Sequence, residues 1–441
     1  GLSQARPLRV GVIGGGIGGL SLANALIQQD SAFDVTVFDK AAVLRPGLGG
    51  GVQLTGGAAV LARLGFGEEL VAAGHPLRRV LTRKVPPAVG GAGAVEPKQL
   101  LDLDVRSALA DLEDARETGL LQDTGDVMAF TIMRDELLRM LAARLPEGMV
   151  RYGKRLEGLE RSDGEEGIQC TFDDASTETF DLVVGCDGIR SAVREWVLEG
   201  NDGARETYSG LRIRFGVAPS CGGRGAGSRE EMHQWFADGA YALTATYGGV
   251  GGEEYDMIAL TTTDKNEVGP NANWDSSEVQ QDTCRILNDL GFPGEVLSIA
   301  ESSTRFFDIG VRFQNPLLPW VRSDGNFWTR GSAAAVLLGD AAHAMPPFLG
   351  QGANQAIQDA YCLAEELGAV GDRHRDVQGA LAAYEVRRKP VTSLLMLESR
   401  FLGRLETLQG AGAEFRNLFF QATGTLGVAK AIFTKGASPR V

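Results

Sequence analysis

The 441-residue chain contains little cysteine and histidine, and this scarcity argues against two kinds of site. Its five cysteines are odd in number and widely scattered, which favours reduced, unpaired thiols over a disulfide framework. Only four histidines are present, with no Cys/His cluster at metal-ligand spacing, so we predict no metal site. The cysteines are Cys170, Cys186, Cys221, Cys284 and Cys362. We therefore expect the cytoplasm or another reducing compartment.

Basic residues and long apolar runs are also scarce. Lysine and arginine total 43 against 57 acidic residues, and the net charge of −14 disfavours nucleic acid or an anionic membrane as the main partner. The best candidate for a membrane span, around Val336, is broken by Asp340 and His343, so we predict no integral membrane segment. No targeting segment is visible before the first predicted strand. If such a segment was removed from this sequence, an organelle is an alternative location. We expect an ordinary soluble enzyme with two interleaved domains, a monomer or homodimer whose partners are small molecules.

Glycine, in contrast, is abundant, with 59 residues, and one cluster near the start fits G-x-G-x-x-G. The apolar run Leu8–Ile13 precedes it, and a helical stretch and a second strand ending in Asp39 follow. Gly14 permits a tight turn, Gly16 lets the backbone approach a pyrophosphate, and Gly19 lets helix pack on strand. Asp39 follows Gly19 by about 20 residues, where a carboxylate is expected for ribose hydroxyls. This pattern predicts a dinucleotide site that favours FAD or NAD over NADP.

A second motif, Gly339–Asn354, joins a predicted buried strand to a predicted helix. Asp340 would stand at the carboxyl end of the strand Ala333–Leu338, where its carboxylate can accept hydrogen bonds from ligand hydroxyls. The loop that follows is stiffened by two prolines and feeds a helix from Ala353 to about Leu367, whose N-terminus stabilises negative charge. A reduced flavin would suit such a place. The alternative is a plain Gly/Pro-rich connection.

A third segment, Asp181–Arg194, runs from an apolar strand through Asp187 and Gly188 into a helix that bears Arg190. Taken alone, it predicts one more strand–turn–helix unit with an N-cap-like aspartate.

The order and spacing of these three segments resemble the FAD-dependent aromatic hydroxylase superfamily, the single-component flavoprotein monooxygenases. Within it the chain is most similar to the salicylate hydroxylase and zeaxanthin epoxidase-like branch. The resemblance covers essentially the whole chain. It implies an α/β fold in which a Rossmann-like FAD-binding domain of the glutathione reductase type carries an inserted antiparallel-sheet substrate domain and C-terminal helices.

The resemblance also implies which residues bind FAD. The glycine cluster and Asp39 would hold the ADP half, and the Asp-Gly segment would serve FAD and has been linked to the pyridine nucleotide. The Gly-Asp motif would hold the ribityl chain and flavin ring. Arg134 would start a helix beside the flavin, preceded here by Met133 where the family often has His, and the segment from Tyr384 is implied to be structural. The expected cofactor residues are Gly14, Gly16, Ile17, Gly18, Gly19, Asp39, Lys40, Arg45, Gly51, Val52, Arg134, Asp187, Gly188, Gly339, Asp340, Pro346, Gly350, Gln351, Gly352, Ala353 and Asn354.

The motifs divide the chain into residues 1–205 and 331–380 for the two parts of the FAD domain, 206–330 for a substrate lid, and 381–441 for C-terminal helices. We predict a loop or hairpin at Pro86–Ala94 and an exposed loop at Ser220–Ser228. Four strand-like runs should form the lid sheet over the isoalloxazine: Leu211–Val217, His233–Phe236, Tyr241–Tyr247 and Met257–Thr262. Two C-terminal helices, Ser393–Leu408 and Glu414–Phe433, are predicted to serve core packing.

The lid also supplies our candidate catalytic and substrate residues, His233, Tyr241, Tyr247 and Phe215. His233 has a pKa suited to deprotonating a phenol, although a surface or packing role is the alternative. Relatives that act on aromatic acids often have Arg before a Gly in this stretch, whereas here Phe215 precedes that Gly. Arg214 stands one place earlier, which in a strand faces the other side. This disfavours a salicylate-type carboxylate substrate.

The function implied is an FAD-dependent monooxygenase. NAD(P)H would reduce FAD, and one oxygen atom of O2 would pass from a flavin hydroperoxide to a small aromatic or apolar polyene, by hydroxylation or epoxidation. No second G-x-G-x-x-G exists for the nicotinamide, which is normal in this family. A desaturase or reductase on the same fold stays open. A halogenase is disfavoured because its tryptophan-rich motif and lysine are absent, and a non-enzymatic relative is disfavoured by the intact Asp340 loop.

Overall fold

The structure is a computed structural model. It describes residues 6–29, 33–44, 49–87, 96–162, 167–199, 205–220, 230–264, 266, 277–323, 334–369, 373–425 and 427–441. Arg45 and Cys221, both singled out above, lie outside these ranges, as does most of the predicted loop after Ser220.

A six-stranded sheet in the order β18-β19-β12-β1-β2-β8 forms the base of the cofactor domain. All neighbours are parallel except β18 and β19. The strands are β1 (Leu8–Ile13), β2 (Phe33–Asp39), β8 (Val150–Tyr152), β12 (Leu182–Gly185), β18 (Val321–Ser323) and β19 (Ala334–Leu337). The glycine cluster, Asp187 and Asp340 follow β1, β12 and β19, which are adjacent. Their loops therefore meet at one edge of the sheet, outside the carboxyl ends of the strands, where ligands bind in open α/β sheets.

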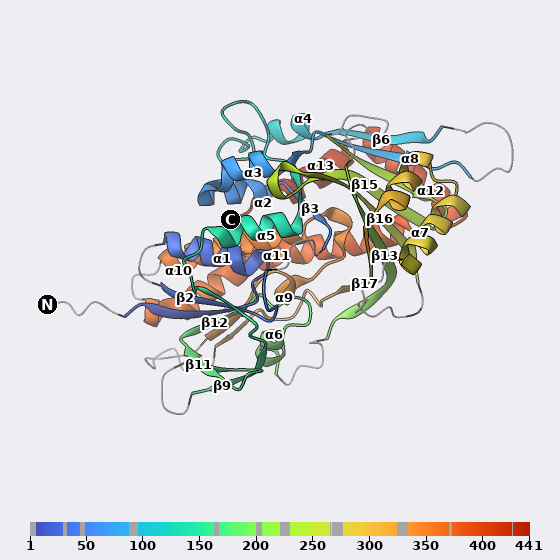
Figure 1. Cartoon of the computed structure of the whole chain (residues 1–441). Coiled ribbons are helices and arrows are strands. Elements are labelled where there is room, and N and C mark those ends of the chain that lie inside the picture. Colours follow the sequence, from blue (N-terminus) through green and yellow to red (C-terminus); the bar gives the residue numbers. More distant parts are fainter. Residues whose placement is uncertain are drawn as a thin grey trace.

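Helices cover one face of this sheet and a small antiparallel sheet covers the other (Figure 1). The helices are α1 (Ile17–Gln28), α5 (Arg134–Ala143) and α10 (Gly352–Ala369), and α1 packs on both of the others. The small sheet consists of β9 (Leu156–Arg161), β10 (Ile168–Phe172) and β11 (Thr177–Phe180). Phe172 and Phe180 from this sheet contact Phe38 of β2, with ring centroids 4.4 and 5.7 Å away. These contacts seal the core under the parallel strands. The Rossmann-like half of the predicted fold is confirmed.

The second large unit is a mostly antiparallel sheet in the order β17-β13-β16-β15-β14-β5-β6, in which only β14 and β5 among these neighbours run parallel. Its strands are β5 (Arg79–Lys84), β6 (Lys98–Asp104), β13 (Thr207–Pro219), β14 (Glu231–Ala237), β15 (Ala240–Gly248), β16 (Glu254–Thr263) and β17 (Arg305–Phe313), with β3 (Gly51–Leu54), β4 (His75–Pro76) and β7 (Phe130–Met133) attached beside them. The four predicted lid strands are confirmed. The hairpin β5–β6 joins the sheet from the stretch assigned to the first part of the FAD domain, so the sheet crosses the boundary predicted at residue 205.

Two helices that we did not predict cover the outer face of this sheet, α7 (Ser277–Asp289) and α8 (Gly294–Ser302) (Figure 1). They bury Trp235, Ile258 and Phe306, which project from the outer face. Their sequence does carry a helical period, since Val279, Thr283 and Leu287 recur at intervals of four and are buried. The sequence analysis predicts only strands in the insertion. The inner face of the sheet is turned toward the cofactor domain.

The C-terminal region forms three helices, α11 (Arg373–Glu406), α12 (Ala411–Thr425) and α13 (Val428–Ala437). The prediction of two helices starting at Ser393 was wrong in number and in start. The first helix runs through Pro390, which removes only one helical hydrogen bond. The second predicted helix ends before Gly427, whose φ of 71° is left-handed and is typical of the residue beyond a helix end.

The remaining described elements are α2 (Gly56–Leu61), α3 (Gly67–Ala73), α4 (Val105–Ala110), α6 (Ala192–Val197), α9 (Asp340–His343) and the short segments η1 (Ala62–Phe66), η2 (Val250–Gly252) and η3 (Pro347–Leu349). Within the described ranges, no helix has the length and apolar character needed to span a bilayer.

Candidate active site

Of the three glycines of the G-x-G-x-x-G motif, the fold needs Gly14 and Gly19, whereas Gly16 faces open space. A Cβ on Gly14 would lie 2.3 Å from the carbonyl oxygen of Cys186, and its φ is +111°. A Cβ on Gly19 would lie 2.0 Å from the carbonyl oxygen of Gly14, so the first turn of α1 packs directly on the loop. A Cβ on Gly16 would meet no atom within 4 Å. Gly16 therefore borders a space at the N-terminus of α1, a 12-residue helix whose N-terminal end would stabilise a pyrophosphate bound there.

Asp39, at the end of β2, closes this loop. Its Oδ2 accepts a hydrogen bond of 2.7 Å from the main-chain N–H of Gly15, and its Oδ1 accepts one of 2.7 Å from Ala41. Each carboxylate oxygen keeps a second lone pair for a ligand hydroxyl. Lys40 beside it is exposed. Asp39 thus holds the loop in shape and stays available to a ribose.

Asp187 has one oxygen engaged and one without a partner. Oδ2 accepts from the main-chain N–H groups of Ala192 and Val193, at 2.7 and 3.4 Å, at the start of α6. Oδ1 is buried and receives no hydrogen bond from the described residues, and burial raises the pKa of this carboxyl. A buried oxygen left unpaired is costly unless a ligand satisfies it. The other segment residue, Arg190, pairs with Glu206 at 3.1 Å near the surface instead.

Asp340 lies at the carboxyl end of β19 and opens onto a cavity. Its side chain is accessible there, and no described residue donates a hydrogen bond to it. The surrounding protein raises the pKa of Asp340 by desolvation, against the opposing influence of His343 and Arg134. Arg134 begins α5 and donates its main-chain N–H to the carbonyl of Gly50, at 3.1 Å. The structure therefore brings Asp340 near Arg134 and the strand that starts at Gly51.

The loop after Asp340 is held by hydrogen bonds within the protein, on the side away from the cavity. Asn354 accepts from the main-chain N–H groups of Thr55 and Gly57 and donates to the carbonyls of Gln53 and Gly350, all between 2.8 and 3.0 Å. These four bonds use the ordinary capacity of its amide, so Asn354 positions the loop. Pro346, which we expected at the cofactor, is buried and its carbonyl accepts a 2.5 Å bond from the hydroxyl of Ser399. Its neighbour Pro347 lines the cavity instead.

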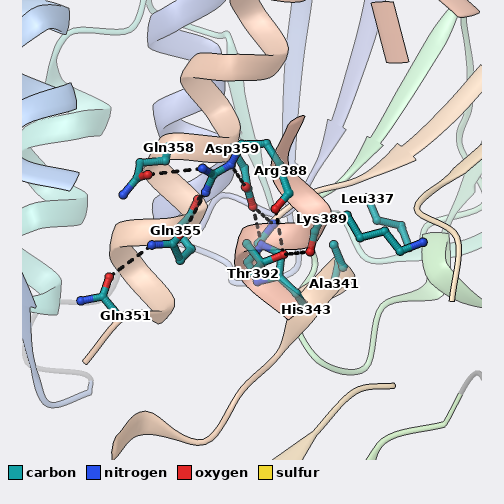
Figure 2. A network of polar contacts seen from close by, with 12 residues as sticks. Leu337, Ala341, His343, Gln351, Gln355, Gln358, Asp359, Arg388, Lys389 and Thr392 are labelled. Atoms are coloured by element: carbon teal, nitrogen blue, oxygen red, sulfur yellow. Dashed lines mark hydrogen bonds and ion pairs between the residues drawn. The ribbon is translucent and has the colours of Figure 1, made fainter. Parts of the chain in front are cut away.

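A fully buried ion network stands behind the same turn (Figure 2). Asp359 of α10 accepts from His343 Nε2 at 2.5 Å, from Arg388 Nε at 2.8 Å and from the main-chain N–H of Gly339 at 3.2 Å. Although desolvation acts in the opposite direction, His343 and Arg388 lower the pKa of Asp359. Tyr384 donates to the carbonyl of Leu337 at 3.1 Å. The segment from Tyr384 to Arg388 thus ties α11 to the end of β19.

A cavity of about 390 Å³ lies between the Asp340 loop, the inner face of the large sheet and the C-terminal helices. Of the candidate substrate residues, Phe215, Tyr241 and Tyr247 line it. The predicted cofactor residues that line it are Gly51, Val52, Asp340, Gly350, Gln351, Gly352 and Ala353. A Cβ on Gly51 would lie 2.0 Å from the ring of Tyr247, so the lid sheet touches the cofactor domain closely here. Two sets of residues predicted separately therefore share one space.

The C-terminal helices contribute a wall that we did not predict. The lining residues from α11, α12 and α13 are Leu395, Leu402, Glu406, Phe419, Phe420, Thr423, Ala429, Ile432, Phe433 and Gly436. Their apolar stripes were visible in the sequence and were assigned to core packing. A stripe that borders a cavity has the same pattern as one that borders protein, so the sequence offered no signal to separate them.

His233 lies away from this cavity. Its neighbours Met232 and Gln234 line the cavity, and alternate residues of a strand face opposite sides. His233 Nδ1 instead lies 2.5 Å from Arg83 Nη1, and its ring stacks on Trp235 with centroids 5.8 Å apart. Desolvation, together with Arg83 and Arg79, lowers the pKa of His233 to about 4. The structure gives His233 a packing role and does not bring it to the substrate.

The described residues that line the cavity include two carboxylic acids, Asp340 and Glu406. They include no Arg, Lys or His. Arg214 ion-pairs with Asp282 at 2.9 Å, and Arg212 pairs with Asp308, both on the outer side of the sheet. The one-residue shift between Arg214 and Phe215 therefore has the predicted effect on the side that each side chain faces. No group of His, Cys, Asp and Glu in the described ranges has the arrangement of a metal site.

Comparison with known proteins matches the family described as FAD binding domain to residues 8–220 and 328–399. An FAD-dependent monooxygenase of Aspergillus terreus is 30% identical over 420 residues, covering 92% of this chain and 88% of that protein. A salicylate hydroxylase of Pseudomonas putida is 29% identical over 413 residues, covering 91% and 87%.

Solved structures share the fold over nearly the whole chain. HpxO of Klebsiella pneumoniae, complexed with FAD and uric acid, has a TM-score of 0.74 at 21% identity and covers 98% of this chain and 97% of that one. A salicylate hydroxylase substrate complex has a TM-score of 0.72 at 23% identity, covering 99% and 98%.

Proposed function

The chain belongs to the family of FAD-dependent aromatic hydroxylases and is an FAD-dependent monooxygenase, and we propose that it uses NAD(P)H and O2 to hydroxylate or epoxidise an uncharged, mainly apolar aromatic or polyene substrate. The observation that supports this best is the cavity itself. It joins Asp340 and the Gly350–Ala353 loop to a wall of aromatic and aliphatic side chains, and the described residues of this wall include no cation. A ligand pocket of this kind is concave, mostly apolar and furnished with a few polar groups.

The residues present fit FAD. Open space at Gly16, a free oxygen on Asp187 and an unengaged carboxylate on Asp340 are the features that an extended dinucleotide would satisfy. Bound FAD would take electrons from the nicotinamide and activate O2. The remaining work falls to the chain. Tyr247 lies against Gly51, and Sδ of Met257 lies so near Gly50 that a Cβ added there would be 3.1 Å from it. The lid therefore leaves little room for water where it meets the cofactor domain.

The substrate class follows from what lines the cavity. Named relatives include salicylate and 6-methylsalicylate hydroxylases, whose substrates are acids by name. Here Phe215 stacks on Phe307 with centroids 4.7 Å apart. By the family resemblance, relatives that act on aromatic acids often have an arginine at the Phe215 position, and an arginine can bind a carboxylate. A buried carboxylate without a cation is costly. An uncharged phenol or another apolar compound therefore suits this wall better than an aromatic acid.

A matched substrate pair tests the proposal. We expect 1-naphthol to stimulate NAD(P)H oxidation and to yield a product that carries one ¹⁸O atom from ¹⁸O2, whereas 1-hydroxy-2-naphthoate should be poorly coupled. Phe215→Arg should shift the preference toward the acid, and Phe215→Leu is its control for lost aromatic packing. Coupled hydroxylation of the acid by the unmodified protein would overturn the substrate class. A product oxidised without ¹⁸O would instead favour a desaturase.

A further inference from the structure

Glu406, the last residue of α11, is a buried acid in the cavity wall. Its side chain is 2% exposed, and its Oε2 receives no hydrogen bond from the described residues. Burial raises the pKa of this carboxyl well above its usual range. Glu406 lines the cavity, and a buried polar atom without a partner calls for a ligand group or another explanation.

The nearby arginine does not neutralise Glu406 directly. Arg416 donates Nη1 to the main-chain carbonyls of Glu406 and Ala237, at 2.9 and 3.0 Å, and its other nitrogens bond the side chain of Asn417. These bonds close the turn between α11 and α12. The carboxyl of Glu406 feels the charge of Arg416 but forms no ion pair with it. Its hydrogen-bonding capacity therefore remains for the cavity.

Two polar side chains of the large sheet face the same end of the cavity. Gln234 donates Nε2 to the hydroxyl oxygen of Tyr241 at 3.3 Å, and Thr82 donates to Oε1 of Gln234 at 2.7 Å. The hydroxyl of Tyr241 thus accepts one bond and makes no donation to the described residues. Glu406 is close enough to raise the pKa of Tyr241 further, after the larger effect of burial. A donor and an unpaired carboxyl accordingly stand together.

This end lies far from the cofactor end. Tyr241 and Tyr247 occupy the same face of β15, six residues apart, which corresponds to about 20 Å along a strand at 3.3 Å per residue. Tyr247 packs on Gly51 at the cofactor end. Between them the lining is apolar, with Leu243 on the same face and Phe348 and Leu402 from other elements.

We propose that Glu406 is a substrate-binding residue that, with Tyr241, hydrogen-bonds an uncharged hydroxyl group at the end of the substrate remote from the oxidised carbon. The inference rests on the proposed function and adds the polar anchor of the same site. A hydroxyl can donate to the carboxyl group of Glu406 and accept from Tyr241, so it pairs both groups at once. A carboxylate would meet a second acid. An amine would require an ionised Glu406.

The test uses four ligands with one apolar frame: biphenyl, 4-hydroxybiphenyl, 4-aminobiphenyl and biphenyl-4-carboxylate. Binding is measured by calorimetry on the full-length protein with its oxidised flavin and without NAD(P)H. The wild type should bind 4-hydroxybiphenyl about 10-fold more tightly than biphenyl, the factor expected from a hydrogen bond to a buried acid. Glu406→Leu should remove this preference, and Glu406→Gln should keep most of it because the amide still pairs with a hydroxyl.

Controls separate the other readings. Tyr241→Phe should reduce the preference in part, and Glu414→Leu, a surface acid of α12, should leave it unchanged. An equal preference in the wild type and in Glu406→Leu overturns the proposal, as does the absence of any binding across the series. If the wild type prefers 4-aminobiphenyl and both Glu406→Gln and Glu406→Leu abolish this preference, the bound group is a cation and not a hydroxyl. That result would also overturn the proposal. If the protein binds no FAD but still prefers the hydroxylated ligand, the proposed function is refuted while the role of Glu406 in binding a hydroxyl stands.

Discussion

The three acids at the edge of the parallel sheet differ in how much of each carboxylate remains for a ligand. Asp39 accepts from two main-chain N–H groups, Asp187 uses one oxygen to accept from N–H groups in the first turn of α6, and Asp340 bonds none of the described residues. The fold therefore depends on the first two for its own loops. Only the third is placed without a local structural task, so its substitution gives the cleanest measure of cofactor binding.

Asp340→Ala should weaken FAD binding by about 10- to 100-fold, because a hydrogen bond to a charged group contributes roughly 1.5–3 kcal/mol. The measurement is titration of the apoprotein with FAD, followed by quenching of flavin fluorescence. The FAD affinity of Asp340→Asn, which keeps an acceptor, should fall between those of the wild type and Asp340→Ala. Full flavin retention by Asp340→Ala after gel filtration would rule out the assignment.

Gly16→Val should abolish cofactor loading more severely than Asp39→Ala. The backbone at Gly16, with φ of −82° and ψ of −173°, suits valine, and the space around it is open, so the apoprotein should fold. The branched side chain would then fill the place of the pyrophosphate. Gly14→Val, which must clash with Cys186, is the contrasting variant and should fail to fold. Normal flavin content in Gly16→Val would show that the pyrophosphate binds elsewhere.

His233→Gln should make the protein less sensitive to acid. The folded pKa of His233 is about 4 and the usual value is 6.5, so below pH 6.5 the unfolded chain binds a proton that the folded one refuses. Stability present above pH 6.5 is thus lost as the pH falls toward 4, by up to about 3 kcal/mol. Urea unfolding at pH 7 and pH 4.5 should show a smaller loss for the variant. Turnover at pH 7 should change less than about twofold, since the side chain faces away from the cavity. If the wild type and His233→Gln lose the same stability between pH 7 and pH 4.5, His233 is not the source of the acid sensitivity.

At the scale of elements, the network of Asp359 joins α9, α10 and α11 behind the cofactor loop (Figure 2). The family resemblance implied that the segment at Tyr384 is structural, and its contacts in the structure give the reason. Neither the resemblance nor the sequence pattern predicted that α11 extends from Arg373, because Pro390 indicates a boundary. A long helix tolerates a single proline when tertiary contacts on both sides hold it.

Arg388→Met should destabilise the protein by about 3–5 kcal/mol, because it removes the guanidinium that pairs with the fully buried Asp359 at 2.8 Å. The adjacent Arg387 is 41% exposed and pairs with Glu366 at 2.9 Å, so Arg387→Met should cost less than about 1 kcal/mol. Denaturant unfolding of the two variants makes the comparison. Similar losses in both would show that the buried network contributes no more than a surface pair.

At the scale of the whole molecule, the sequence specifies the cofactor side far better than the substrate side. The glycine cluster and Asp340 sit in strand–loop–helix units whose geometry is local, so spacing alone predicts their neighbours. The cavity instead assembles residues 51–53, 80–103, 213–261, 340–353 and 395–436, and which face of each element meets the others is decided by packing. Phe215 could be placed by strand alternation. Glu406 could not, because a single acid after an apolar stripe reads as the solvent end of a helix.

This assembly makes the cofactor a link between distant parts of the chain. FAD would contact loops that follow β1, β12 and β19, and the cavity beyond it is closed by the large sheet and α13. A ligand that binds only the folded state stabilises it by RT ln(1 + [L]/Kd), about 2.7 kcal/mol at a concentration of 100 times Kd. The Tm of the apoprotein should therefore rise with added FAD. Riboflavin, which lacks the ADP half, should raise it much less at equal concentration, and Gly16→Val should abolish the FAD effect while keeping the Tm of the apoprotein. A Tm that does not respond to FAD in the wild type would mean that these loops do not hold the cofactor in the way that their geometry indicates.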